Sequence, residues 1–245
     1  DAQQMLASII SENWLRLKAV FGIWRANSHE DDIYIYDQKG DRIAISYTLR
    51  QQLKKAKGAT NRALSDYIAP KSNKIDDYIG AFVVTAGGGI ESKIREFEED
   101  HDDYNSILLK ALADRLAEAS AEYLHELVRK DYWGYANEEK FSNDELIKEK
   151  YKGIRPAPGY PACPDHTEKE TIFDLLSATE KIGVSLTESL AMYPASSVSG
   201  WYFAHPESKY FGLGKIKEDQ VADLAQRKGV DKEVMMRWLS SNLSD

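Results

Sequence analysis

Apolar residues recur along the chain with two different periods, which predicts both helices and strands. Residues 2–17 place Met5, Leu6, Ile9, Ile10 and Trp14 at the three- and four-residue spacing of an amphipathic helix. The same spacing predicts a helix over 91–130 with a break near 101–103, a helix beginning at 142–145, an exposed helical turn at 50–57, and helices over 168–181, 218–228 and 232–239.

Within the long helix, the apolar stripe predicts which face is buried. Leu112, Leu116, Ala119, Tyr123 and Leu127 fall on one face, and Arg115, Glu122 and Glu126 stand off it. Glu118 lies well away from the centre of that stripe. In the helix over 168–181, residues Ile172, Leu175, Leu176 and Thr179 are expected to point inward, and Gly183 is expected to end it.

Strand patterns are clearest at residues 77–85, an almost unbroken apolar run. A short apolar run covers 19–24, and β-rich stretches at 33–36 and 42–47 flank a turn ending in Gly40, which indicates a hairpin. Further strand-like stretches cover 185–192, 198–203 and 210–216. Turns at Pro194 and Pro206 separate them, so the simplest pairing is an antiparallel meander.

The order of these elements favours an α+β fold. Helices and strands are both abundant, yet they do not alternate regularly along the chain. A doubly wound parallel sheet requires that alternation. We therefore predict a single domain, residues 1–245, with a largely antiparallel β-sheet flanked by helices.

Composition narrows the classes of function. The net charge of -8 and the lack of a basic stripe argue against a nucleic-acid partner. No apolar run approaches the roughly 20 residues that cross a bilayer, and no leader pattern opens the chain, so we expect no membrane partner and a cytoplasmic location. The single cysteine fits a reducing compartment. Because Asp1 already reads as the inside of a helix, we expect this chain to be part of a longer protein.

Common catalytic and metal motifs are weak or incomplete. Gly87, Gly88 and Gly89 join a strand to a helix without the GxGxxG spacing or a Gly-Lys-Ser/Thr ending, so we interpret them as a plain turn, with a self-contained nucleotide-fold methyltransferase as the alternative. Cys163 and His166 lack the further ligands that zinc needs, and His125 begins an HExxH pattern that Arg129 breaks. We predict no metal site and no catalytic residue.

Residues 155–169 form the most unusual stretch of the chain. Pro156, Pro158, Pro161 and Pro164 fall here, out of 7 prolines in all, together with the only cysteine. Proline fixes φ and removes an amide donor, so this loop is stiff, and Gly159 supplies a position where a ligand or another backbone can approach closely. A stiff loop between two helices indicates a binding function. Cys163 itself is interpreted as a small packing residue.

The string R-P-A-P-G-Y-P-A-C-P-D-H-T-E-K at 155–169 resembles the signature of the C-terminal activation domain of cobalamin-dependent methionine synthase. Other parts of the chain resemble the same family in order, from Asp1 nearly to the C-terminus. They are the segments at 77–82, 101–105, 110–119, 132–135 and 197–203.

This resemblance implies that the domain binds S-adenosylmethionine and presents its methyl group to a cobalamin held by a neighbouring domain, with flavodoxin or an equivalent reductase supplying an electron. It also implies the ligand contacts. Carried over by position, these are Glu118, Arg155, the loop Pro156, Ala157, Pro158, Gly159 and Tyr160, and the pair Tyr210 and Phe211.

The residue types suit that ligand. Arg155 can form a two-pronged pair with the methionyl carboxylate, Glu118 can face the ammonium or the sulfonium, and Tyr210 offers an aromatic face beside a cation. Three alternatives stay open: Arg155 as an exposed helix-end cation, Glu118 paired with Arg115, and Tyr210 as a sheet-packing residue.

One part of the family pattern is not found in this sequence. An Asp-Trp-x-Pro-Phe segment precedes the opening helix in the family, and its aspartate contacts the ligand, so we expect weaker binding without it. The chain would act as part of methionine synthase, a methyltransferase, and is not expected to be catalytic by itself. A docking module without ligand, for a cobalamin domain or flavodoxin, is the alternative function.

Overall fold

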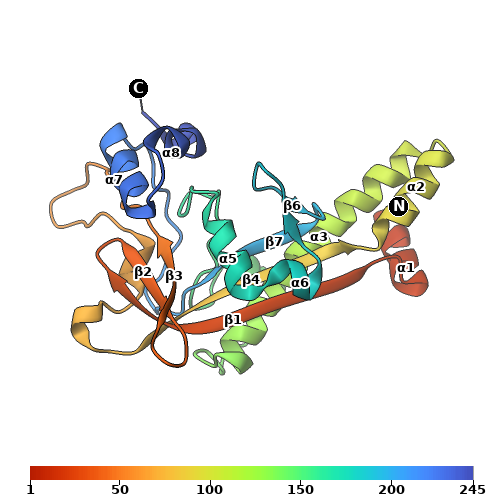
Figure 1. The fold of residues 1–245 in the computed structure, drawn as a ribbon. Helices are drawn as coiled ribbons and strands as arrows, with labels where there is room; N and C mark the ends of the chain where they lie inside the picture. The colour runs from red at the N-terminus through yellow and green to blue at the C-terminus, as the bar shows by residue number, and fades with distance from the viewer. Residues whose placement is uncertain (245) are drawn as a thin grey trace.

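A computed structural model describes residues 1–244 of the chain. Its five-stranded antiparallel sheet has the order β3-β2-β1-β4-β7, with helices on both faces and at both ends (Figure 1), so the predicted α+β class is confirmed. The strands are β1 (Arg16–His29), β2 (Asp32–Tyr36), β3 (Arg42–Tyr47), β4 (Asp77–Gly88), β5 (Ser185–Leu186), β6 (Met192–Tyr193) and β7 (Ser197–Tyr202). The helices are α1 (Ala2–Glu12), α2 (Ile90–Glu99), α3 (Asp103–Leu127), α4 (Asn143–Ile147), α5 (Glu168–Leu176), α6 (Ala178–Ile182), α7 (Glu218–Lys228) and α8 (Lys232–Trp238).

The central strand β4 is buried on both faces, which explains its continuous apolar sequence. Successive side chains of a strand point to opposite faces. Ile79, Ala81 and Val83 accordingly pack in the cluster that contains α5 and α6. Phe82 and Val84 pack on the other face, in the cluster that contains the end of α3. The sheet is therefore the middle layer between α3 and the α5–α6 pair.

The predicted hairpin at 33–47 is confirmed as β2 and β3, which pair with Ile33 opposite Ser46. Gly40 adopts a φ of 90° in the turn between them, as the sequence suggested.

The opening helix is shorter than predicted. It ends at Glu12, and Asn13 takes a left-handed conformation with φ 55° that closes it. The apolar run at 19–24 is then only the middle of β1, which is extended by its pairing with β4 from Arg16 onward. The ladder with β4 turns residues that have no strong strand signal of their own into a long strand.

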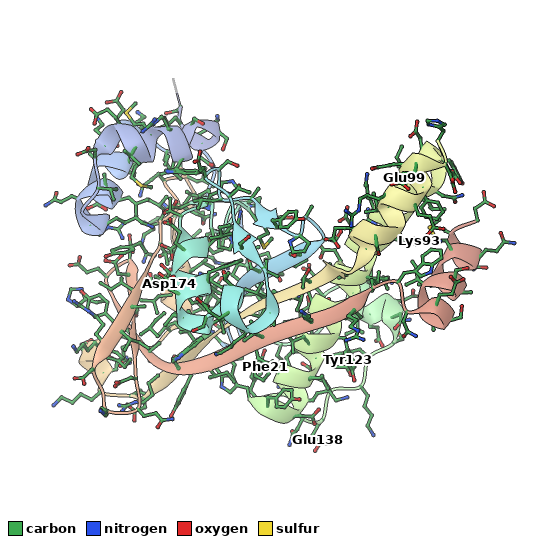
Figure 2. The ribbon with its side chains drawn as sticks, turned by 45° about the vertical axis from the view of Figure 1, so that its right-hand side comes forward. Phe21, Lys93, Glu99, Tyr123, Glu138 and Asp174 are labelled. Carbon is green, nitrogen blue, oxygen red and sulfur yellow. The ribbon has the colours of Figure 1, made fainter. Side chains whose placement is uncertain are left out.

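The break in the long helical region is confirmed, because α2 ends at Glu99 and α3 begins after the N-cap Asp102. The predicted buried face of α3 is wrong. Ala119 and Tyr123 are exposed, Tyr123 by 64% (labelled in Figure 2), whereas the buried stripe includes Ala113, Ala117 and Ala121. Small side chains let the helix approach the sheet closely, so close packing selected the alanine face over the leucine face.

The helix predicted over 168–181 is two helices. Ser177 lies between α5 and α6 with φ 50°, and the change of direction leaves Thr179 exposed instead of inward. Ile172 and Leu176 are buried as expected, and Gly183 ends α6 with φ 77°.

The predicted C-terminal meander is wrong. The predicted strand 185–192 turns back on itself: Ser185–Leu186 form β5, and Met192 begins β6, with which β5 pairs as a two-stranded ribbon. Strand β7 pairs with β4 at the edge of the main sheet. Residues 210–215 form no strand. Their carbonyl and amide groups bond instead to side chains and loops, for example Leu213 N–H to the Pro161 oxygen at 2.8 Å.

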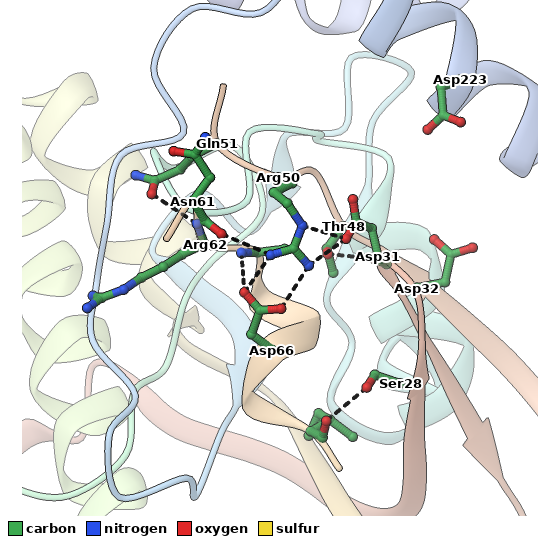
Figure 3. A network of polar contacts seen from close by, with 12 residues as sticks. Ser28, Asp31, Asp32, Thr48, Arg50, Gln51, Asn61, Arg62, Asp66 and Asp223 are labelled. Atoms are coloured by element: carbon green, nitrogen blue, oxygen red, sulfur yellow. Dashed lines mark hydrogen bonds and ion pairs between the residues drawn. The ribbon is translucent and has the colours of Figure 1, made fainter. Parts of the chain in front are cut away.

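The predicted helical turn at 50–57 is also wrong, because this segment is irregular. Arg50 extends from it between two carboxylates, contacting Asp31 at 2.6 Å and Asp66 at 2.7 Å (Figure 3). A fork of guanidinium donors shared by two carboxylates fixes the segment by its side chain. No local helical hydrogen bonds are needed there.

The C-terminal helices α7 and α8 form as predicted, with Gly229 ending the first and Asp231 as N-cap of the second. Lys228 of α7 contacts the fully buried carboxylate of Glu168 at 2.9 Å and that of Asp165 at 2.8 Å. These ion pairs connect α7 to the start of α5. Among the described residues 1–244, no helix is both long and apolar enough to span a membrane.

Candidate functional site

The segment that carries Arg155 runs along the free edge of β7. Ile154 and Phe203 exchange two backbone hydrogen bonds of 3.0 Å, and Trp201 N–H donates to the Pro156 oxygen at 3.0 Å. Gly200 permits this approach, since an added Cβ would lie 2.9 Å from that oxygen. Ile154 packs in the α5–α6 cluster. By alternation, Arg155 therefore points to the α3 side of the sheet.

The Arg155 side chain meets Glu122 of α3 there. Its Nη2 lies 2.6 Å from Glu122 Oε2, and the side chain is 19% exposed. Burial alone would lower the pKa of the guanidinium, but the Glu122 carboxylate raises it above its usual value. Arg155 is thus a largely buried, paired cation on a strand-like segment, and the alternative of an exposed helix-end cation is wrong.

Residues 157–166 form a compact loop closed by its own backbone. Gly159 N–H donates to the Cys163 oxygen at 2.7 Å, and Cys163 N–H donates to the Tyr160 oxygen at 2.9 Å. Gly159 has a φ of 91°, and a Cβ there would lie 2.3 Å from the ring of His166. Cys163 is buried in the core, and burial raises the pKa of its thiol, so its interpretation as a packing residue is confirmed.

Tyr210, Phe211 and Gly212 lie across from the Arg155 segment and the 157–166 loop, and contacts to distant segments hold them in place. The Tyr210 hydroxyl accepts a hydrogen bond from the Arg155 backbone N–H at 2.9 Å. Gln51 Nε2 donates to the Gly212 oxygen at 2.7 Å, and the ring of Tyr67 lies 6.5 Å from that of Phe211. Burial raises the pKa of Tyr210, which keeps the hydroxyl neutral. The residue is 38% exposed and lies outside every strand, so packing in a sheet does not account for it.

Together these segments enclose a cavity of about 500 Å³. The structure brings seven of the nine predicted site residues into its lining: Glu118, Arg155, Pro156, Ala157, Tyr160, Tyr210 and Phe211. Pro158 and Gly159 do not line it; Pro158 is buried, and Gly159 faces an adjoining hollow. The alternative pair between Glu118 and Arg115 is not found among residues 1–244, and Glu118 lines the cavity.

Five further residues line this cavity: Glu149, Pro161, Ala162, Val198 and Gly212. Pro161, Ala162 and Gly212 adjoin predicted residues, so their positions in the sequence already suggested them. Glu149 and Val198 had no such signal, because one lies in an irregular segment and the other in β7. The lining therefore combines two carboxylates, one guanidinium and two tyrosines with an apolar floor.

Behind the cavity lies a buried polar layer on the last turns of α3. A π-helical turn, η3 (Val128–Tyr132), directs Arg129 inward, where its Nε contacts Glu139 at 2.9 Å and the side chain is 1% exposed. The ring of His125 stacks on Tyr202 at 5.1 Å. Burial first, and then Arg129 and Arg155, lower the pKa of His125 well below its usual value. Its imidazole is therefore neutral.

The glycines at 87–89 are separate from this site. Gly87 lies where a Cβ would come within 2.2 Å of Pro194, and Gly89 is the N-cap of α2 with φ 95°. The plain strand-to-helix turn is confirmed. Among the described residues 1–244, no group of histidine, cysteine, aspartate or glutamate side chains could hold a metal ion.

Comparison with known proteins identifies the family. Residues 1–229 match the model of the vitamin B12 dependent methionine synthase activation domain. The chain belongs to that family. A solved structure, the MetH reactivation domain bound to AdoHcy (S-adenosylhomocysteine), is 54% identical, with a TM-score of 0.96 over 100% of this chain and 76% of that one. The activation-domain family predicted from residues 155–169 is therefore confirmed.

Proposed function

We propose that this activation domain binds S-adenosylmethionine in the cavity beside Arg155 and supplies its methyl group for the reductive methylation of cobalamin in methionine synthase. The observation that carries the proposal is the cavity of about 500 Å³, which gathers Arg155, Glu118, Tyr210 and the 156–162 loop from distant parts of the chain. The 54% identity to a reactivation domain bound to AdoHcy supports the ligand class.

Each charged group of the cavity matches a group of the ligand. Arg155 would hold the methionyl carboxylate through a charge-assisted pair made by its Nη1. This nitrogen makes no hydrogen bond among residues 1–244, whereas Nη2 already donates to Glu122. Glu118 and Glu149 would face the ammonium or the sulfonium. The rings of Tyr160 and Tyr210 would supply aromatic surface beside the cationic sulfur.

The chemistry needs little from the protein beyond placement. The methyl carbon of S-adenosylmethionine would be attacked by the reduced cobalt, and the carbon–sulfur bond would break. The sulfur keeps the electron pair of that bond, so the product is the neutral thioether S-adenosylhomocysteine. Arg155 would orient the ligand by binding its amino-acid end. Pro156, Ala157 and Phe211, which also line the cavity, would limit the movement of the ligand. No side chain has to take or give a proton in this reaction.

The cobalamin domain of the same enzyme and a reductase, flavodoxin or its equivalent, are the partners we propose. The methyl group must reach a cobalt that this domain does not hold, and a one-electron donor must reduce the cobalt first. The activation domain would act as one part of methionine synthase, a methyltransferase, without turnover by itself.

Titration calorimetry with S-adenosylhomocysteine tests the ligand site. We expect saturable binding by the wild-type protein and a loss of about 30-fold in affinity for Arg155→Ala, since hydrogen bonds to a charged group are worth about 2 kcal/mol. Arg95→Ala, on the exposed surface of α2, is the matched control and should bind as the wild type does.

Unchanged affinity in Arg155→Ala would reject the assigned site. A wild-type protein that binds neither S-adenosylhomocysteine nor S-adenosylmethionine, but still binds the cobalamin domain or flavodoxin, would favour the docking module without ligand.

A further inference from the structure

Glu122 occupies a position one helical turn beyond Glu118 on α3, yet it has a different environment. Glu118 is exposed and lines the cavity, whereas the Glu122 side chain is 26% exposed and lies beneath the cavity wall against Arg155. Residues four apart on a helix lie on the same face, so the two carboxylates face the same loop at different depths. Of these two carboxylates, only that of Glu118 belongs to a residue that lines the cavity.

A chain of alternating charges passes through Glu122. Its Oε2 contacts Arg155 Nη2 at 2.6 Å, and its Oε1 lies 4.0 Å from Arg129 Nη1. Arg129 in turn contacts Glu139 at 2.9 Å, and the second oxygen of Glu139 accepts the Lys152 backbone N–H at 2.8 Å. The guanidinium of Arg129 also lies 4.2 Å above the ring of Tyr151.

This chain of charges encloses the segment that leads into Arg155. Glu139 and Lys152 lie at either end of the segment containing α4 and Glu149, and Ile154 begins the pairing with β7. Arg129 is buried to 1% exposure, so its position is fixed by packing. The Glu122 carboxylate lies between this fixed guanidinium, at 4.0 Å, and the guanidinium of Arg155, at 2.6 Å.

We infer that Glu122 is a positioning residue for ligand binding: it does not touch the ligand, but its reach to Nη2 holds the Arg155 guanidinium with Nη1 directed to the ligand carboxylate. The inference rests on the proposed function. It concerns the length of the Glu122 side chain more than its charge, because a short contact at 2.6 Å, and not a long-range field, defines the rotamer.

Two substitutions separate reach from charge. Glu122→Asp keeps the charge and shortens the side chain by one methylene, and Glu122→Gln keeps the length and an oxygen acceptor while removing the charge. With S-adenosylhomocysteine in calorimetry, we expect Glu122→Asp to weaken binding five- to tenfold and Glu122→Gln to stay within twofold of the wild type. Binding of 5′-methylthioadenosine, which lacks the amino-acid group, should not respond to Glu122→Asp.

The matched control is Glu126→Asp, one further turn along α3. The Glu126 carboxylate lies 3.0 Å from Lys130 Nζ and does not pair with Arg155. Glu126→Asp should leave affinity unchanged, and thermal melting of all variants establishes that each is folded. Wild-type affinity in Glu122→Asp, an equal or larger loss in Glu122→Gln, or an equal loss for both ligands would overturn the inference. If the wild-type protein itself fails to bind, the proposed function fails instead.

Discussion

The Tyr210 hydroxyl accepts a hydrogen bond from the backbone N–H of Arg155 at 2.9 Å, and this contact between residues far apart in the chain joins two walls of the cavity. The contact uses the hydroxyl as an acceptor and leaves the tyrosine ring to form cavity surface. It also satisfies an amide that lies beyond the last strand of the sheet.

Tyr210→Phe should therefore weaken ligand binding without removing the aromatic wall. Losing one hydrogen bond costs about 1 kcal/mol, which corresponds to about fivefold in affinity for S-adenosylhomocysteine by calorimetry. Tyr123→Phe, on the exposed side of α3, is the control and should bind as the wild type does. Wild-type affinity in Tyr210→Phe would show that the hydroxyl does not hold the wall.

Gly159→Ala should destabilise the loop more than a glycine substitution elsewhere. The added Cβ would lie 2.3 Å from the His166 ring, and the alanine backbone would have to adopt a φ of 91°. We expect a loss of about 3 kcal/mol in the free energy of unfolding by urea titration. Gly183→Ala has a φ of 77° with nothing within 4 Å, so it isolates the backbone cost of about 1 kcal/mol. Equal losses in the two variants would contradict a steric role for Gly159.

The buried alanine face of α3 predicts opposite outcomes for two neighbouring positions. Ala117→Leu should lower the free energy of unfolding by about 2 kcal/mol, because overpacking forces the helix away from its neighbours. Ala119→Leu, two residues on and exposed, should change it by less than about 0.5 kcal/mol. Urea titration of the two variants measures both values. A larger loss of stability in Ala119→Leu than in Ala117→Leu would mean that the face predicted from the sequence, which contains Ala119, is the buried one.

The neutral His125 predicts a loss of stability on acidification. Burial and two arginines keep the folded pKa well below the unfolded value of about 6.5, so below that pH the unfolded state binds a proton that the folded state does not. Between pH 6.5 and 5.5 the wild type should lose about 1 kcal/mol more than His125→Phe, which keeps a ring against Tyr202. Urea titrations at the two pH values compare them. Identical pH dependence would mean that His125 takes up its proton at the same pH in the folded and the unfolded protein.

Local chemistry in the sequence determined the elements whose signals are complete within a few residues. Gly40, Gly183 and Gly229 end or turn elements at the predicted positions, because a left-handed φ is inexpensive only for glycine. The proline-rich stretch at 155–169 was correctly identified as a loop as far as Thr167, the N-cap of α5, for the same reason: its backbone restrictions are intrinsic to its residues. Its unusual composition also identified the family.

Contacts between distant segments decided the rest. Periodicity predicted a helix at α3 but not which stripe meets the sheet, and close packing chose Ala113, Ala117 and Ala121. Residues 210–215 have strand-forming side chains, yet the 154–156 segment occupies the edge of β7 and leaves them irregular. The Arg155–Glu122 pair joins a loop to a helix across the sheet edge, and no spacing in the sequence specifies such a meeting. The sequence therefore predicted most of the residues that line the cavity. Only the tertiary structure determined the partner of each residue, because that depends on how α3 packs against the sheet.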